Sequence, residues 1–318
     1  PLPIDEIAGD FLRLVRKGRN TVVVAEPGAG KVPRLPRLLH EAEPAWGVVG
    51  LEPVRSAARL SAERIASELG EPVGRRVGYE TRERSVTGSE TTLRFLTEGI
   101  LTRRLLADQR LEGVRVVIFD ELHERHLATD LCLALCLGLQ RASRPALVIV
   151  AMSATLDAAS VTAFLDGELL TSEGRTFPVT ITHRDKPDDR PLSAQVAAGV
   201  AEGLGLQPDG DVLVFLPSAR EIRAAKTALS ALAQRRGLIL AELFGAQSAR
   251  EQDLALRRTE QRKVILATNV AETSITIDGV TAVVDSGLAR AASCAPHTGL
   301  PRLVETKIAR ASARQRAG

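Results

Sequence analysis

The sequence is poor in aromatic residues and cysteine, and it has no long hydrophobic run. Of its 318 residues, 3% are aromatic and 3 are cysteines. Any core must therefore be built from Leu, Val, Ile and Ala rather than from rings. Three cysteines, an odd number in a long chain, do not suit a disulfide framework. Because no apolar run approaches the roughly 20 residues that cross a bilayer, we expect a cytoplasmic protein without a membrane partner.

An excess of one charge is also lacking. The chain has 42 basic and 39 acidic residues, a net charge of +3, and shows no polycationic tail. Its length suggests two domains of ordinary size, and a hydrophobic content of 44% is enough for their cores. The chain starts with proline and stops at residues 315–318 without a closing element, so we expect a fragment.

Short apolar segments alternate with helical patterns through the first half of the chain. We expect strands at residues 21–25, 47–51, 92–97, 114–119 and 147–152. Helical patterns lie between them, near residues 56–69, 98–107 and 127–141. This alternation predicts an α/β fold with a mostly parallel sheet, which binds ligands at the carboxyl ends of its strands.

A polar, proline-containing stretch then interrupts the pattern, and the alternation restarts beyond it. We therefore expect a first domain over residues 1–180, a linker over 181–191, and a second α/β domain over 192–318 that is incomplete at its C-terminal end. Past residue 285 the pattern predicts a hairpin with its turn near residues 294–299.

One motif is typical of a phosphate-binding loop. The segment Ala25-Glu-Pro-Gly-Ala-Gly-Lys31 closes an apolar strand and opens a helix. Gly28 and Gly30 allow backbone N–H groups to face phosphate oxygens, and Lys31 adds a positive charge. A lone glycine-rich loop is more often an ordinary turn, but its place after a strand favours the nucleotide site. The other members of this candidate site are Pro27, Ala29 and Val32.

A second motif, Asp120-Glu-Leu-His123, follows the apolar strand at 114–119. One carboxylate can hold Mg²⁺ through water, and the other can take a proton from an attacking water. The plainer alternative is a pair of surface carboxylates that caps a strand end. His123 and His126 stand three residues apart rather than four, so we do not expect a helical zinc site.

Together with Ser153-Ala-Thr155, these motifs resemble the DEAH-box helicases of superfamily 2. Further blocks fit the same family in the same order, at residues 52–55, 97–101, 174–179, 215–217, 266–278 and 315–318. The sequences of these blocks are most similar to those of the bacterial HrpB-type ATP-dependent helicases. The resemblance covers essentially the whole chain.

The resemblance implies two tandem RecA-like P-loop NTPase domains that bind ATP with Mg²⁺. Asp120 would hold the metal through water, and Glu121 would be the general base. The remaining catalytic residues that the family implies are His123, Ser153, Thr155 and Gln315. Asp278 and Arg316 would lie toward the nucleotide. The hydroxyls of Ser153 and Thr155 could equally be a structural cap.

The resemblance also implies contacts to a nucleic-acid backbone. The first domain would contribute Arg55, Thr97 and Gly99, and the second would contribute Thr268, Asn269 and Thr273. Backbone contacts predict single-stranded or duplex RNA as partner, with little sequence preference. The hairpin past residue 285, with Arg290 and Arg302, resembles the family's strand-separating hairpin, although these arginines could equally form a solvated face.

The chain departs from the family pattern at four places. Val32 replaces a hydroxyl residue that coordinates Mg²⁺, so that water must fill the lost position. Pro33 and Val54 replace a small hydroxyl residue and an arginine. The chain also ends within the last block, before the arginines that would act as fingers, which are worth about 10³–10⁵ in rate.

These features leave three functions open. The leading interpretation is an ATP-dependent RNA helicase motor. The alternative is a degenerate, nucleic-acid-binding module with little or no ATP turnover, which Val32 and the early end favour. A DNA-directed motor is the third, because backbone contacts distinguish RNA from DNA mainly through the 2′-hydroxyl.

Overall fold

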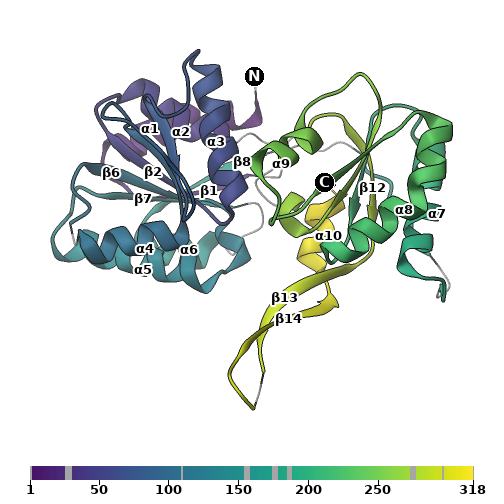
Figure 1. Ribbon diagram of the computed structural model, residues 1–318. Coiled ribbons are helices and arrows are strands. Elements are labelled where there is room, and N and C mark those ends of the chain that lie inside the picture. The colour runs from purple at the N-terminus through teal and green to yellow at the C-terminus, as the bar shows by residue number, and fades with distance from the viewer. Residues whose placement is uncertain are drawn as a thin grey trace. The chain divides into compact units, whose positions relative to one another are not determined.

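The computed structural model divides the chain into two compact units, residues 1–177 and 178–318 (Figure 1). It describes residues 2–25, 31–108, 110–153, 158–173, 178–184, 188–272, 277–295 and 297–317. Each unit consists of a mostly parallel sheet flanked by helices, which confirms the predicted α/β fold class. The assignment of residues 181–191 as a linker stays a prediction.

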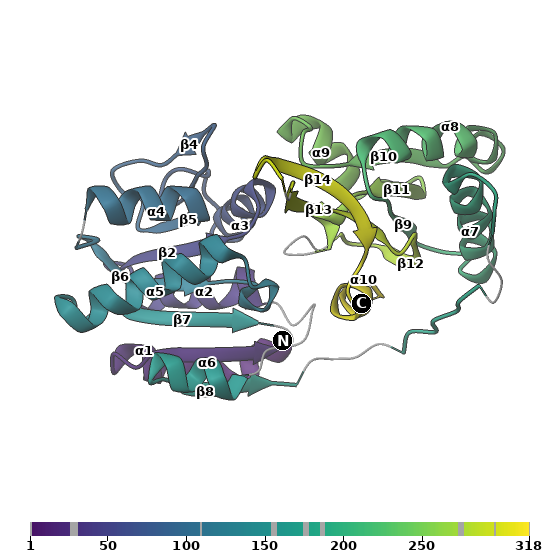
Figure 2. The ribbon, with the colours of Figure 1, turned by 90° about the horizontal axis from the view of Figure 1, so that it is seen from below.

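The first unit alternates strands and helices along the chain. Its elements are η1 (Pro3–Ile7), α1 (Ala8–Arg16), β1 (Thr21–Ala25), α2 (Lys31–Ala42), β2 (Gly47–Glu52), α3 (Arg55–Glu68), β3 (Val77–Glu80), β4 (Ser85–Val86), β5 (Leu93–Thr97), α4 (Glu98–Ala107), β6 (Val114–Phe119), η2 (Leu122–Glu124), α5 (Leu127–Ala142), β7 (Val148–Ser153), α6 (Ala158–Leu165) and β8 (Glu168–Ser172). The strands lie in the order β4-β3-β5-β2-β6-β7-β1-β8, part of which can be followed in Figure 2. Strand β4 pairs antiparallel with β3, and the other neighbouring strands pair parallel.

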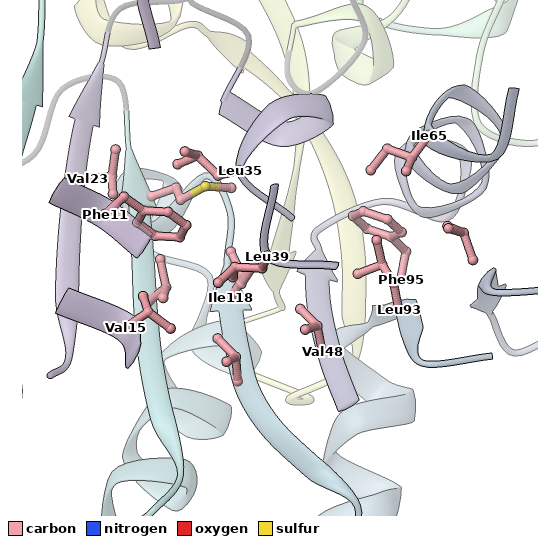
Figure 3. Close-up of a cluster of buried hydrophobic side chains, with 14 of the residues drawn as sticks. Phe11, Val15, Val23, Leu35, Leu39, Val48, Ile65, Leu93, Phe95 and Ile118 are labelled. Carbon is pink, nitrogen blue, oxygen red and sulfur yellow. The ribbon is translucent and has the colours of Figure 1, made fainter. Parts of the chain in front are cut away.

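Helices cover both faces of this sheet, and each face has its own core. Residues of α1, α2 and α3 pack on one face, with Phe11, Leu39 and Ile65 among them (Figure 3). Residues of α4, α5 and α6 pack on the other face. Because β2, β6 and β7 are largely buried on both sides, their sequences are mostly apolar rather than alternating, with Glu52 and Arg115 as the charged exceptions.

The second unit has a smaller parallel sheet in the order β10-β11-β9-β12. Its elements are α7 (Leu192–Leu206), β9 (Asp211–Phe215), α8 (Ala219–Arg236), β10 (Ile239–Leu243), α9 (Ala249–Leu256), β11 (Lys263–Ala267), η3 (Asn269–Ala271), β12 (Val280–Asp285), β13 (Leu288–Cys294), β14 (Pro301–Lys307) and α10 (Arg310–Ala317). Helices α7 and α8 pack on one face of the sheet, and α9 and η3 contribute to the core on the other.

Strands β13 and β14 form an antiparallel hairpin that extends away from the sheet of the second unit (Figure 1). Cys294 is the last residue of β13 and pairs with Pro301, which opens β14. The hairpin predicted past residue 285 is confirmed, whereas the predicted turn at residues 294–299 includes residue 296, which lies outside the described residues. Within the described parts of the chain, no helix combines the length and the apolar character needed to cross a membrane.

Candidate nucleotide-hydrolysis site

The strand order of the first unit brings three predicted motifs to one edge of its sheet. Strands β1, β7 and β6 are neighbours and run parallel, so their carboxyl ends lie side by side. Ser153, the last residue of β7, is fully buried and lies beside Val24 of β1. Phe119 of β6 lies beside Ala151 of β7, so that Asp120 follows at the level of the strand ends. The acidic motif and Ser153 therefore share the edge at which β1 leads into the phosphate-loop sequence.

Several predicted site residues lie outside the residues that the structure describes. They are Pro27, Gly28, Ala29, Gly30, Thr155 and Thr273. Lys31 and Val32 are the first two residues of α2, directly after the loop sequence. The strand-to-helix context predicted for the loop is thus present, since β1 ends at Ala25 and α2 begins at Lys31.

Asp120 is held at the end of β6 by the sheet itself. Its backbone N–H donates a hydrogen bond to the carbonyl oxygen of Leu51 in the neighbouring strand β2, at 3.2 Å. The residue is only 4% exposed. A carboxylate that is fixed by backbone pairing at a strand end provides a hard oxygen donor of the kind that Mg²⁺ prefers.

Glu121 has a left-handed backbone conformation, with φ 51° and ψ 35°. This region costs a residue with a side chain about 1–3 kcal/mol, and such residues are concentrated at functional sites. A hydrogen bond from the Glu124 N–H to the Glu121 carbonyl, at 2.9 Å, closes the turn that follows. The sharp turn directs the chain out of the sheet immediately after the two carboxylates.

The side chains of Glu121 and His123 form a buried pair. His123 Nε2 lies 3.3 Å from Glu121 Oε2, and each side chain is 9% exposed. The imidazole lies against the carboxylate, and burial restricts the position of both side chains. The pair gives a carboxylate held in one position, which is what a general base requires.

The predicted nucleic-acid residues of the first unit also lie at strand ends. Glu52 of β2 pairs with Thr97 of β5, so the turns that lead to Arg55 and Gly99 begin side by side. Arg55 is the first residue of α3, and Thr97 is the residue before α4. Helix starts carry exposed N–H groups and partial positive charge, which attract phosphate. The half-exposed Arg55 forms an ion pair with Glu83, an exposed residue.

The second unit places its predicted residues around β11, β12 and the hairpin. Thr268 follows β11, and its N–H donates to the carbonyl of Leu243 at 3.0 Å. Asn269 begins η3, and Asp278 lies in the turn before β12. Arg302 is exposed on β14, opposite Ser293 of β13.

Arg316 is enclosed within the second unit. Its side chain is 1% exposed and pairs with Glu272 at 2.8 Å and Asp285 at 2.9 Å. Its guanidinium carbon also lies 4.7 Å from the centre of the Phe215 ring. These contacts tie α10, which also contains Gln315, to the end of η3 and to β12. The predicted contact of Arg316 with the nucleotide stays a prediction.

Sequence reasoning missed the residues that support these sites. Glu272 and Asp285 hold Arg316, and Glu98 accepts hydrogen bonds from Thr129 and His126. His126 was considered only as a zinc ligand. Glu98 could have been noticed in the sequence, because it stands between the predicted residues Thr97 and Gly99. Its partners could not, because they are distant along the chain.

Comparison with known proteins gives matches over the whole chain. The helicase conserved C-terminal domain matches residues 197–318. The chain is 40% identical to the ATP-dependent RNA helicase HrpB of Escherichia coli K12 over 323 residues. A crystal structure of E. coli DEAH/RHA helicase HrpB matches 100% of the chain with a TM-score of 0.92 and 39% identity. Over its whole length, the chain is therefore similar to the HrpB helicase of E. coli.

A second crystal structure, of the E. coli DExH-box NTPase HrpB, matches 99% of the chain with a TM-score of 0.82 and 39% identity. The resemblance to HrpB-type DEAH-box helicases that the motifs indicated is therefore confirmed. The chain spans 39% of the HrpB sequence, and 41% and 39% of the chains in the two structures.

Proposed function

We propose that this chain is the two-unit motor of an ATP-dependent RNA helicase, which binds and hydrolyses ATP and moves along RNA. The observation that carries the proposal is the turn after β6, in which Asp120 and the left-handed Glu121 stand at the same sheet edge as the end of β1. The similarity to an ATP-dependent RNA helicase supports the choice of nucleotide and of RNA. A cytoplasmic location stays a prediction.

Mg²⁺, when bound with ATP, would neutralise charge on the phosphate oxygens. The buried carboxylate of Asp120 suits this ion and would hold it through water. Glu121 would take the proton of the attacking water, while His123 keeps its carboxylate in place at 3.3 Å. Lys31 would meet the phosphates from the start of α2.

RNA would bind across the strand ends that carry Arg55, Thr97 and Gly99. The adjacent starts of α3 and α4 offer N–H groups to phosphate, and Arg55 can exchange its exposed partner Glu83 for a phosphate at little cost. Contacts of this kind do not read bases, which predicts binding with little sequence preference.

The second candidate is a nucleic-acid-binding module with little or no ATP turnover. Val32 favours it, because valine cannot supply the oxygen that a hydroxyl residue would offer to Mg²⁺. The two candidates differ only in turnover, so a single kinetic measurement separates them.

The test is steady-state ATP turnover by the chain with and without single-stranded polyuridylate RNA. We expect turnover that rises with RNA, and a fall of about 10²–10⁴-fold in Glu121→Gln, which keeps the shape of the side chain but cannot accept the proton. RNA binding without turnover in the parent would favour the second candidate. Turnover in Glu121→Gln equal to that of the parent would contradict the role of Glu121.

Comparing RNA with DNA of the same sequence addresses the third possibility. We expect single-stranded RNA to stimulate turnover more than single-stranded DNA, because the 2′-hydroxyl offers additional hydrogen bonds. Equal stimulation by both would favour a motor that does not distinguish them.

A further inference from the structure

His126 lies between two carboxylates that belong to different functional segments. Its Nδ1 lies 3.4 Å from Glu98 Oε1, and its Nε2 lies 3.2 Å from Glu124 Oε2. Glu98 is the first residue of α4, directly after Thr97, and Glu124 is the last residue of η2. One imidazole therefore connects the candidate RNA-binding start of α4 with the turn that carries Glu121.

Both ends of this connection are held by further contacts. Thr129 of α5 donates a hydrogen bond to the same Glu98 oxygen that faces His126. Glu124 is joined to Glu121 through the backbone hydrogen bond at 2.9 Å. The side chains of Glu98 and Glu124 are mostly buried, at 17% and 19% exposure, so their positions are restricted.

The charges around His126 favour the imidazolium. The hydrogen bond to Glu98 raises the pKa of His126 above its ordinary value, against the effect of burial, and the charges of Glu124 and Asp130 act in the same direction. Burial raises the pKa of Glu98, but the hydrogen bonds from His126 and Thr129 outweigh it and lower that pKa overall. Arg125, which neighbours His126 along the chain, is paired with Asp130 at 2.9 Å.

The protonation state decides whether the connection is complete. The imidazolium has two N–H donors and can donate to Glu98 and Glu124 at once. A neutral imidazole has one N–H, so one of the two carboxylates then faces a ring nitrogen that cannot donate. We call the connection from Glu98 through His126 to Glu124 the bridge. Both of its hydrogen bonds can form only when His126 is charged.

On the basis of the proposed helicase function, we propose that His126 is a positioning residue that couples RNA binding at the start of α4 to the orientation of the Glu121 turn. Phosphate binding at Thr97 and Gly99 fixes the start of α4, and with it Glu98. The imidazolium passes this restriction to Glu124 and hence to the backbone of Glu121. RNA therefore orders the general base through His126, while ATP hydrolysis without RNA does not depend on the bridge.

The first test compares ATP turnover with and without polyuridylate RNA in the parent, in His126→Gln and in His183→Gln. His183 is an exposed histidine elsewhere in the chain and serves as the matched control. We expect basal turnover in His126→Gln within about twofold of the parent, and a fall of about tenfold in the stimulation by RNA, within the usual range of coupling between sites. Unchanged stimulation in His126→Gln would overturn the proposal.

The proposal predicts the direction in which the stimulation of ATP turnover by RNA changes with pH. Because the pKa of His126 is raised, the bridge is complete at low pH and is lost as the pH rises through this pKa, above about 6.5. The stimulation by RNA should decline over this range in the parent and in His183→Gln, and stay flat in His126→Gln. A decline of the same size in His126→Gln would contradict the bridge.

The second test does not need turnover, and so separates this proposal from the proposed function. The imidazole of His126 is followed by NMR during a pH titration, and is assigned with His126→Gln among the 5 histidines of the chain. We expect a pKa above the ordinary value, a lower one in Glu124→Gln, and a further change in the parent when polyuridylate RNA is added, because coupling acts in both directions.

If the parent shows no turnover, the helicase function fails, while a response of His126 to RNA still supports the coupling. The absence of that response overturns it.

Discussion

Glu121 shows how much of the site depends on the conformation of one residue. A glycine would adopt its left-handed backbone more readily, but only a carboxylate can act as a base there. The cost of about 1–3 kcal/mol is carried by the surrounding hydrogen bonds, including those from the Asp120 and Glu124 N–H groups. A left-handed residue directly after a buried strand supports the proposal that the motif is a site rather than a strand cap.

Val32 provides the prediction that belongs to the residue scale. Changing Val32→Thr restores a hydroxyl at the second residue of α2 with almost no change of volume. We expect ATP turnover to rise and half-maximal activation to require less Mg²⁺, because one inner-shell water is replaced by a protein oxygen. The measurement is a magnesium titration of ATP turnover.

The matched control is Val32→Ala, which has neither the hydroxyl nor the branched shape. If Val32→Thr and the parent have the same magnesium dependence, a water molecule already replaces the hydroxyl as a ligand of Mg²⁺ without loss.

At the scale of helices and strands, burial explains what could be predicted from the sequence. Strands β1, β6 and β7 lie in the sheet interior, and their mostly apolar sequences predicted their positions closely. Strand β8 was missed because it is an edge strand whose side chains are largely exposed. Strand β3 is short and contains Gly78, which weakens its signal.

The candidate site also has a part that the sequence predicts and a part that it does not. The proposed roles of Asp120 and Glu121 rest on residue type and local spacing, so the motif alone predicts them. The partners of His126 and Arg316 could not, because Glu98 and Glu272 are brought to them by the fold. Register and turn geometry supply these contacts, and no pattern along one segment encodes them.

Arg316 gives the prediction that belongs to this scale. Replacing Arg316→Met keeps much of the side-chain volume but leaves Glu272 and Asp285 without their buried cation. Removing one partner of a buried charge network costs about 3–5 kcal/mol, so we expect a clearly lower unfolding midpoint in urea, followed by circular dichroism.

Arg314→Met is the control, since Arg314 lies exposed on the same helix α10. A parent-like midpoint together with weakened ATP binding in Arg316→Met would show instead that Arg316 serves the nucleotide.

At the scale of the whole molecule, the balance of charge limits how nucleic acid can be held. A net charge of +3 over 318 residues provides little general attraction for a polyanion. The proposed binding would therefore depend on local groups, for which the helix starts and Arg55 are the candidates. The salt dependence of RNA binding measures how many such contacts exist.

We predict that Arg55→Ala weakens binding to single-stranded RNA and reduces the slope of log K against log salt concentration by about 0.7, the value for one phosphate contact. Fluorescence anisotropy at several salt concentrations measures this slope. Arg13→Ala is the control, because Arg13 is an exposed arginine of α1 that pairs with Asp10. An unchanged slope in Arg55→Ala would remove Arg55 from the RNA contacts.

The β13–β14 hairpin carries a natural attachment point for a probe. Cys294 is exposed at the end of β13, whereas Cys132 and Cys136 are buried. Burial raises the pKa of Cys136 to about 12 and also raises that of Cys132, so neither forms the reactive thiolate readily at neutral pH. A maleimide dye should therefore label the unmodified sequence at Cys294 alone, which places a fluorescent reporter on the hairpin without any mutation.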